Sequence, residues 1–142
     1  MPRYVSPQQA WELMQQEGYT YVDVRSPEEY AASHPKGAIN LPFLFIGPEG
    51  RRPNPDFLET FRKVLPPGSK FILGCAGGNR SAAAVEVLAR EGWGDEIVEC
   101  RAGFFGRKDA EGRVVETGWS ASGLPCEEGA TEGRSWEDLR RR

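Results

Sequence analysis

The residues FILGCAGGNRS, numbers 71–81, stand at the middle of the chain. Their first part, Phe71-Ile72-Leu73, is an uninterrupted apolar run, which is typical of a strand covered on both faces of a sheet. Small residues of a tight turn follow, and the alanine-rich run after Ser81 has the composition of a helix. The stretch therefore predicts a strand, a turn and a helix, with Cys75 at the carboxyl end of the strand.

The turn after Cys75 has the residues of an anion-binding loop. Gly77 and Gly78 allow positive φ angles, so successive backbone N–H groups can point at one place. The positive end of the following helix faces the same place and, like the charge of Arg80, favours a thiolate. We therefore predict that Cys75 is a nucleophile, and the alternative is a buried core cysteine. The predicted site consists of Cys75, Ala76, Gly77, Gly78, Asn79, Arg80 and Ser81.

Apolar periodicity and helix-capping residues predict alternating helices and strands around this stretch. Such alternation is typical of an α/β fold with a mainly parallel sheet, in which ligands bind beyond the carboxyl ends of the strands. Asp23, Cys75 and Cys100 each fall at such an end. Asp23, Arg25 and Arg101 are therefore predicted neighbours of the Cys75 loop. The predicted helices are 6–18, 26–33, 55–65, 81–92 and 135–139, and the predicted strands are 19–24, a short one within 34–42, 70–74 and 96–100.

The composition is ordinary for a soluble domain, and we treat residues 1–142 as one domain. A net charge of -3 gives no indication of nucleic-acid binding, and no run is long and apolar enough to span a bilayer. Three cysteines, an odd number, suit a reducing compartment, so we expect a cytoplasmic protein. The cysteines lack short metal-ligand spacing, which disfavours a zinc site on Cys75, Cys100, Cys126 and His34. No metal or cofactor is predicted.

Four blocks of the sequence resemble a single-domain rhodanese, a sulfurtransferase of the thiosulfate type. The blocks occur in the order typical of that family and cover residues 4–126, which leaves 127–142 as a C-terminal extension. The resemblance implies a three-layer α/β/α fold with a mainly parallel central sheet. The blocks are Asp23-Val24-Arg25 with Glu29-Tyr30, His34 to Pro42, Cys75 to Ser81, and Gly118-Trp119 with Gly123-Leu124-Pro125.

The resemblance also implies a reaction. Cys75 would accept a sulfane sulfur from thiosulfate or a related donor, become a persulfide, and pass the sulfur to cyanide or a thiol. Covalent transfer predicts ping-pong kinetics, and inward N–H groups would stabilise the charged outer sulfur. The alternative is a carrier module that receives persulfide sulfur from a protein partner and turns over small donors poorly. Related phosphatases have a loop one residue longer than the six from Cys75 to Arg80, which counts against phosphoryl transfer.

Several residues keep two interpretations. Asp23 and Arg25 can polarise the site, but an ion pair that holds the strand end to a helix is favoured. His34, before a turn, has a structural role more often than that of a general base. Arg80 can face the substrate or tie down another loop, and both interpretations stay open.

Parts of the sequence depart from the family pattern. Arg80 is the one cation of the loop, so a thiosulfate dianion would depend on backbone amides and on Arg101 or Lys108. Residues 47–55 are rich in Pro and Gly and indicate a mobile loop, whereas residues 101–118 allow no assignment. The family pattern explains neither the insertion 48–55 nor the segment 104–118, and both are candidates for shaping acceptor choice.

Overall fold

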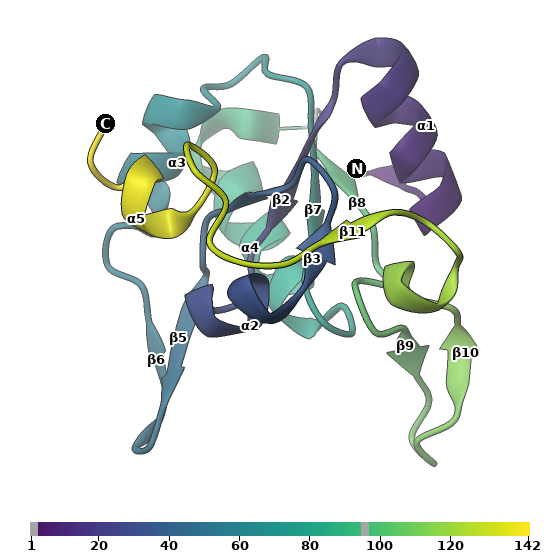
Figure 1. Cartoon of the computed structure of the whole chain (residues 1–142). Helices are drawn as coiled ribbons and strands as arrows, with labels where there is room; N and C mark the ends of the chain where they lie inside the picture. The colour runs from purple at the N-terminus through teal and green to yellow at the C-terminus, as the bar shows by residue number, and fades with distance from the viewer. Residues whose placement is uncertain (1–2, 95–96) are drawn as a thin grey trace.

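Five short strands form a sheet at the centre of the molecule (Figure 1). The structure is a computed structural model that describes residues 3–94 and 97–142. Each neighbouring pair in this sheet is parallel, which confirms the mainly parallel sheet predicted from the sequence. The strands, in sheet order, are β1 (Arg3–Tyr4), β8 (Val98–Glu99), β7 (Phe71–Gly74), β2 (Thr20–Asp23) and β4 (Ile39–Asn40).

Helices cover both faces of this sheet, so the fold has the three layers expected. They are α1 (Pro7–Glu17), α2 (Pro27–Ala32), α3 (Phe57–Val64), α4 (Asn79–Leu88, continued by a π-helical turn, Ala89–Trp93) and α5 (Trp136–Leu139). Along β7, Phe71 and Leu73 pack in the core beneath α3, α4 and α5, whereas Ile72 packs in the core beneath α1. Successive strand residues point to opposite faces, which explains this alternation.

Reciprocal serine caps start α1 and α2. The side chains of Ser6 and Ser26 each accept a hydrogen bond from the N–H three residues on, and the side chains of Gln9 and Glu29 accept from the serine N–H groups in return. Gly18 ends α1 with a φ of 70°, in the left-handed region that favours glycine. The cap at Ser26 has a consequence for the site, because it fixes the position of the Glu29 carboxylate.

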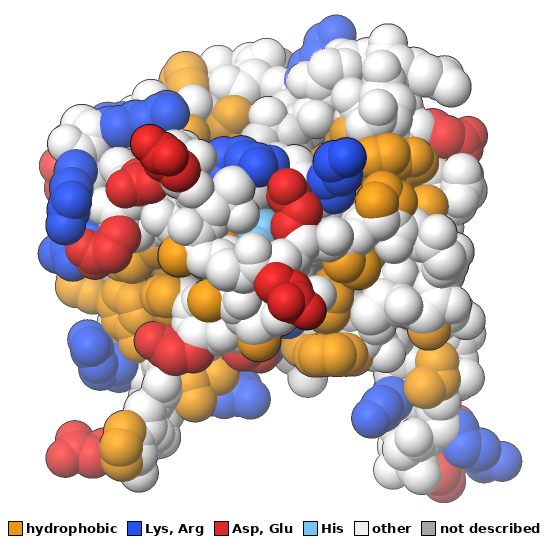
Figure 2. All heavy atoms as spheres, viewed as in Figure 1, with side chains coloured by type: hydrophobic (Ala, Val, Ile, Leu, Met, Phe, Trp, Pro, Cys, Tyr) orange, Lys and Arg blue, Asp and Glu red, His pale blue; other side chains and the backbone are white. Residues whose placement is uncertain are grey.

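Two β-hairpins extend from the end of the molecule that holds the carboxyl ends of β2 and β7 (Figure 1). Figure 2 shows them as two projections with a hollow between them. The pairs are antiparallel: β5 (Leu44–Gly47) with β6 (Gly50–Pro53), and β9 (Arg107–Lys108) with β10 (Val114–Glu116).

The prediction of a loop at 47–55 was therefore wrong, because residues up to Pro53 pair in register with β5. All four residues of β6 are exposed, so the sequence lacks the apolar alternation by which a half-buried strand is recognised. In the segment 101–118, the short strands β9 and β10 are likewise mostly exposed and lack an apolar alternation.

The C-terminal part of the chain packs against the sheet and its helices. β11 (Cys126–Glu127) pairs antiparallel with β3 (His34–Pro35), and α5 buries Trp136 and Leu139 in the same core as α3. A 3-10 turn at Trp119–Ala121 precedes β11. β8 is shorter than the predicted strand 96–100, of which Glu96 lies outside the described residues. Within the described residues, no helix has both the length and the apolar character needed to cross a bilayer.

Candidate functional site

Cys75 lies directly after the central strand β7 and before α4. The residue is buried, with 2% of its surface exposed. Its Sγ atom accepts hydrogen bonds from the N–H groups of Gly78 at 3.1 Å and Ser81 at 3.4 Å. These N–H groups belong to the loop and to the first turn of α4, where the helix dipole is positive. The surroundings of the sulfur therefore favour negative charge on it.

Glycines and main-chain contacts determine the shape of this loop. Gly78 has a φ of 101°, and a Cβ atom there would lie 2.6 Å from the carbonyl oxygen of Arg101. Behind the loop, a Cβ atom on Gly103 would lie 2.4 Å from the carbonyl oxygen of Cys75. The N–H group of Phe104 donates to that same carbonyl oxygen at 2.7 Å. The turn after β8 therefore supports the loop by backbone-to-backbone contact, which only glycines permit.

A buried carboxylate lies behind the sulfur. Ser81 Oγ donates to Glu99 Oε2 at 2.8 Å, and Cys75 Sγ lies 3.5 Å from the same Oγ atom. Glu99 is 2% exposed, and burial raises the pKa of its carboxyl group, although the hydrogen bond from Ser81 and the charge of Arg101 act in the opposite direction. The three side chains form a continuous hydrogen-bonded chain from the thiol to the acid.

Arg80 forms a two-pronged ion pair with Glu29 of α2. Its terminal nitrogens lie 2.5 and 3.0 Å from the two carboxylate oxygens. Burial disfavours the ionised form of Glu29, but hydrogen bonds from Arg80 and Ser26 outweigh it and lower the pKa of Glu29 to about 2. Of the two interpretations of Arg80, this geometry supports the one in which it ties down another segment.

Asp23 and Arg25 form a second ion pair beside the loop. Asp23 lies opposite Gly74 in the register of β2 and β7, which places it next to the start of the loop. Arg25 Nε lies 3.0 Å from each Asp23 carboxylate oxygen, and its terminal nitrogen donates to the Ser33 carbonyl at the end of α2 at 2.6 Å. The guanidinium also lies over the Phe104 ring, 4.5 Å from its centre. The pair therefore joins the end of β2 to α2 and to the turn after β8.

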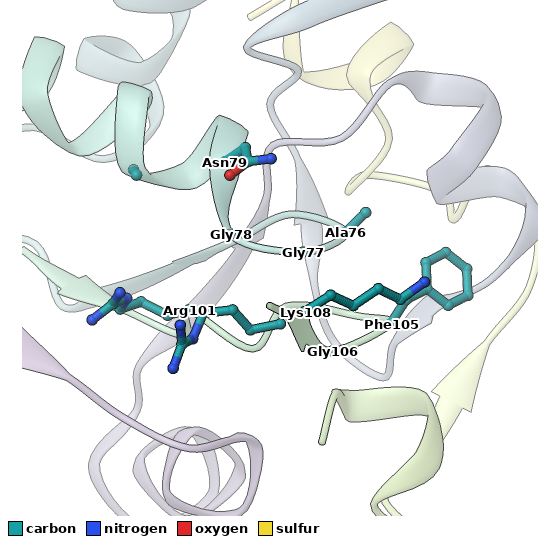
Figure 3. Close-up of a pocket in the computed structure, with 10 residues that line it drawn as sticks. Ala76, Gly77, Gly78, Asn79, Arg101, Phe105, Gly106 and Lys108 are labelled. Atoms are coloured by element: carbon teal, nitrogen blue, oxygen red, sulfur yellow. The ribbon is translucent and has the colours of Figure 1, made fainter. Parts of the chain in front are cut away.

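A pocket of about 580 Å³ opens between the Cys75 loop and the segment that leads into the β9–β10 hairpin. Figure 3 shows the loop on one side of this pocket and Arg101, Phe105 and Lys108 on the other. Arg101 lies over the Tyr4 ring at 4.6 Å, and Arg107 lies 3.4 Å from Glu116. The lining residues are Ala76, Gly77, Gly78, Asn79, Ala82, Arg101, Phe105, Gly106, Arg107 and Lys108.

His34 lies away from this pocket and has structural contacts. It is fully buried and stacks on Tyr30 with the ring centres 3.6 Å apart. One ring nitrogen lies 2.7 Å from the Tyr30 carbonyl oxygen, and the other lies 3.2 Å from Thr131 Oγ1. In the part of the chain that the structure describes, His, Cys, Asp and Glu side chains form no group of three or more that could hold a metal ion.

Sequence reasoning assigned no role at the site to several of its residues. Phe105 and Arg107 line the pocket, Glu29 binds Arg80, and Glu99 lies behind Ser81. Glu99 carried one usable signal, because an acidic residue between Val98 and Cys100 interrupts an apolar strand directly before a strand end. The hairpin residues carried none, since their strands are exposed.

The fold and the loop together define a three-layer α/β protein with a candidate nucleophilic cysteine at the carboxyl end of its central strand. The chain belongs to the rhodanese-like domain family, whose sequence profile matches residues 6–110.

Named relatives agree with this membership. Thiosulfate sulfurtransferase 16, chloroplastic, from Arabidopsis thaliana is 38% identical over 108 residues, which are 76% of this chain and 79% of the relative. Thiosulfate sulfurtransferase GlpE from Actinobacillus pleuropneumoniae serotype 5b is 32% identical over 123 residues, 87% of this chain and 91% of the relative. The crystal structure of Rv0390 from M. tuberculosis superposes with a TM-score of 0.69 at 32% identity and covers 89% of this chain and 97% of that one. Other relatives are longer, and the chain covers 54% and 62% of two of them.

Proposed function

We propose that the chain is a sulfurtransferase that moves a sulfane sulfur from thiosulfate or a related donor to a thiol or cyanide through a persulfide on Cys75. The observation that carries this proposal is the pair of N–H groups, from Gly78 and Ser81, that point at Cys75 Sγ from the loop and the head of α4. Such groups stabilise a thiolate before the transfer and a charged persulfide after it. Relatives named thiosulfate sulfurtransferases support the same reaction class.

The reaction divides into two displacements at sulfur. In the first, the Cys75 thiolate attacks the sulfane sulfur of the donor, a new S–S bond forms, and the S–S bond of the donor breaks. With thiosulfate, sulfite leaves with the bonding electron pair. In the second, the acceptor attacks the outer sulfur and Cys75 leaves as a thiolate, ready for another cycle. Free enzyme and persulfide enzyme alternate, which gives ping-pong kinetics.

The cations beside the loop suit an anionic donor. Arg101 and Lys108 line the pocket in front of residues 76–79, whereas Arg80 is occupied by Glu29. In this proposal Arg101 and Lys108 attract the donor, and the N–H groups receive the charge that reaches sulfur. Asp23 and Arg25 neutralise each other, so their role is to hold the end of β2 in place.

The test compares wild-type protein with Cys75→Ser in thiosulfate:cyanide transfer. Cys126→Ser is the matched control, because Cys126 is exposed and lies outside the loop. We expect transfer in the wild type and the control and none in Cys75→Ser, together with a mass increase of one sulfur atom on Cys75 after donor treatment. Equal activity in Cys75→Ser would exclude Cys75 as the nucleophile. A persulfide without turnover would instead favour the carrier function.

A further inference from the structure

A second pocket, of about 510 Å³, opens where the first turn of α2, the β5–β6 hairpin, the start of α3 and the C-terminal helix α5 meet. Figure 1 shows α5 and this hairpin on the same side of the molecule. The residues that line this α5 pocket are distinct from those that line the pocket in front of the Cys75 loop. Part of its wall comes from the insertion 48–55, and part comes from residues between 130 and 140, beyond the residues that the family profile matches. An insertion and an extension that the family pattern does not explain therefore contribute to one pocket.

The floor of the α5 pocket holds a buried hydrogen-bond acceptor. Asn40 lines the pocket and is fully buried, and its Nδ2 atom donates to the carbonyl oxygens of Asp23 and Arg25, each at 2.9 Å. Because carbonyl oxygens only accept, the amide cannot be turned over, and Oδ1 is fixed in its place. Within residues 3–94 and 97–142, Oδ1 has no hydrogen-bond partner. Leaving a buried acceptor unpaired is unfavourable, and an N–H or O–H donor of a ligand in the pocket would relieve this cost.

The rim of the pocket carries more unpaired acids than unpaired bases. Glu137 and Arg140 both line the pocket and pair with each other at 3.5 Å. In the part of the chain that the structure describes, neither Glu28 nor Asp56 forms an ion pair, and Arg52 forms none either. Asp56 precedes α3, but its side chain makes no capping hydrogen bond to the helix. Two carboxylates against one guanidinium favour a ligand with a positive charge.

Aromatic rings form an apolar part of the wall. The ring centres of Phe45 and Trp136 lie 6.2 Å apart, and Trp136 is 5% exposed. Arg52 lies over the Phe45 ring, 4.8 Å from its centre. Aromatic faces attract cations as well as apolar groups. The volume of the pocket lies within the usual range for organic ligands, roughly 300–1,000 Å³, so a cation with an apolar body would match both its size and its walls.

We propose that the α5 pocket binds an organic molecule with a primary ammonium group, which donates to Asn40 Oδ1 while the carboxylates of Glu28 and Asp56 balance its charge. An ammonium group has three N–H donors and no acceptor, as the floor and the rim of this pocket require. Hydrogen bonds from a charged donor are also stronger than those from a neutral one. The apolar body of the ligand packs against Phe45 and Trp136. The inference goes beyond the proposed function, since it requires no sulfur transfer.

Binding is measured calorimetrically with phenethylamine as the probe and N-acetylphenethylamine as the neutral comparison. The two share the aromatic ring, but the acetylated molecule has no charge. We expect saturable binding of phenethylamine and at least tenfold weaker binding of its acetylated form. Glu28→Gln combined with Asp56→Asn should weaken binding of the amine roughly threefold to twentyfold. Glu59→Gln is the matched control, because Glu59 is an exposed acid of α3 outside the pocket and should change nothing.

The contact with the floor needs a readout that leaves the fold intact, because Asn40 also holds the end of β2. Heteronuclear NMR of the wild-type protein provides one. The side-chain NH₂ signals of Asn40 should shift on addition of phenethylamine and stay in place with N-acetylphenethylamine. The backbone signals of Gly77 and Gly78, which line the other pocket, should not move with either.

Arg52 separates two sources of the ammonium group, a simple amine and an amino acid. Phenylalanine carries a carboxylate beside its ammonium group and is titrated in the same way. If phenylalanine binds more tightly than phenethylamine and loses this advantage in Arg52→Gln, the ligand is an amino acid whose carboxylate pairs with Arg52. Equal or weaker binding of phenylalanine assigns a simple amine.

Equal binding of phenethylamine and its acetylated form, or no binding of any of the three molecules, overturns the inference. Binding that shifts the signals of Gly77 and Gly78 but not those of Asn40 overturns it as well. Cys75→Ser protein should bind phenethylamine as tightly as the wild type does. Failure of sulfur transfer therefore contradicts the proposed function and leaves this inference unaffected.

Discussion

The guanidinium of Arg80 and the carboxylate of Glu29 meet at 2.5 and 3.0 Å, which joins the first turn of α4 to α2. The Arg80 side chain is 8% exposed and that of Glu29 is 28% exposed, so the pair is shielded from water more than most surface pairs are. Glu29 also accepts from the Ser26 N–H at 3.1 Å, which holds the carboxylate in position for Arg80. The pair therefore sets where the Cys75 loop lies relative to α2.

Removing the charge of Glu29 should destabilise the fold. Glu29→Gln leaves the buried Arg80 guanidinium without its ion-pair partner, and we expect a loss of about 1–3 kcal/mol in the free energy of unfolding. Urea denaturation measures it. Glu59→Gln is the control, because the pair of Glu59 with Lys63 is exposed and should contribute less than about 1 kcal/mol. Equal losses in the two variants would show that the Arg80–Glu29 pair contributes no more to the free energy of unfolding than an exposed pair does.

The same ion pair predicts how the stability of the fold changes at acidic pH. The pKa of Glu29 falls from its usual 4.5 to about 2, so folding favours the ionised form. Its contribution is complete above pH 4.5 and is lost as pH falls toward 2. The stability difference between wild type and Glu29→Gln should therefore be constant near neutral pH and shrink between these two values. Urea midpoints across that interval check it, and a difference that persists at pH 2 would contradict the lowered pKa.

A methyl group at Gly78 should disrupt the loop. Gly78→Ala combines a positive φ with a Cβ atom 2.6 Å from the Arg101 carbonyl oxygen, and we expect a loss of about 2–4 kcal/mol together with most of the transfer activity. Gly112→Ala separates the effect of the positive φ from that of the collision. Gly112 has a φ of 81°, but a Cβ atom added there would have no neighbour within 4 Å. That control should lose about 1 kcal/mol and keep full activity. Thermal unfolding and transfer rates give both readouts.

His34→Ala should lower stability without changing the chemistry. The substitution removes a fully buried ring that stacks on Tyr30, and we expect a loss of about 2–4 kcal/mol. The pH profile of sulfur transfer by the folded protein should match that of wild type. A changed profile in a protein of normal stability would restore the general-base interpretation of His34.

Local signals explain what could be predicted from the sequence. Three signals act within a few residues: the apolar run of β7, the glycines after Cys75 and the serine caps. The strand, the loop and the helix N-termini could therefore be predicted. The order of elements then gave the parallel sheet. The position of Cys75 at a strand end followed from the same local pattern.

Long-range contacts explain what could not be predicted. Glu29 and Arg80 are 51 residues apart, and no local pattern states that they meet. The β5–β6 and β9–β10 hairpins are held by cross-strand hydrogen bonds between mostly exposed residues, so their sequences lack an apolar period. β1 has only two residues, too few to show a pattern, and it is positioned in the sheet by pairing with β8. Sequence reasoning therefore located the Cys75 loop, with its candidate nucleophile, and missed much of what surrounds it.

Main-chain contacts, not side chains, connect the turn after β8 to the Cys75 loop. Mutations that change the exposed side chains of the β9–β10 hairpin can therefore accumulate without displacing the sulfur. Gly78 and Gly103 have no such freedom, because any side chain there would collide with the backbone. In evolutionary terms, the side chains of the hairpin can vary among related domains while the backbone that surrounds the Cys75 sulfur stays the same.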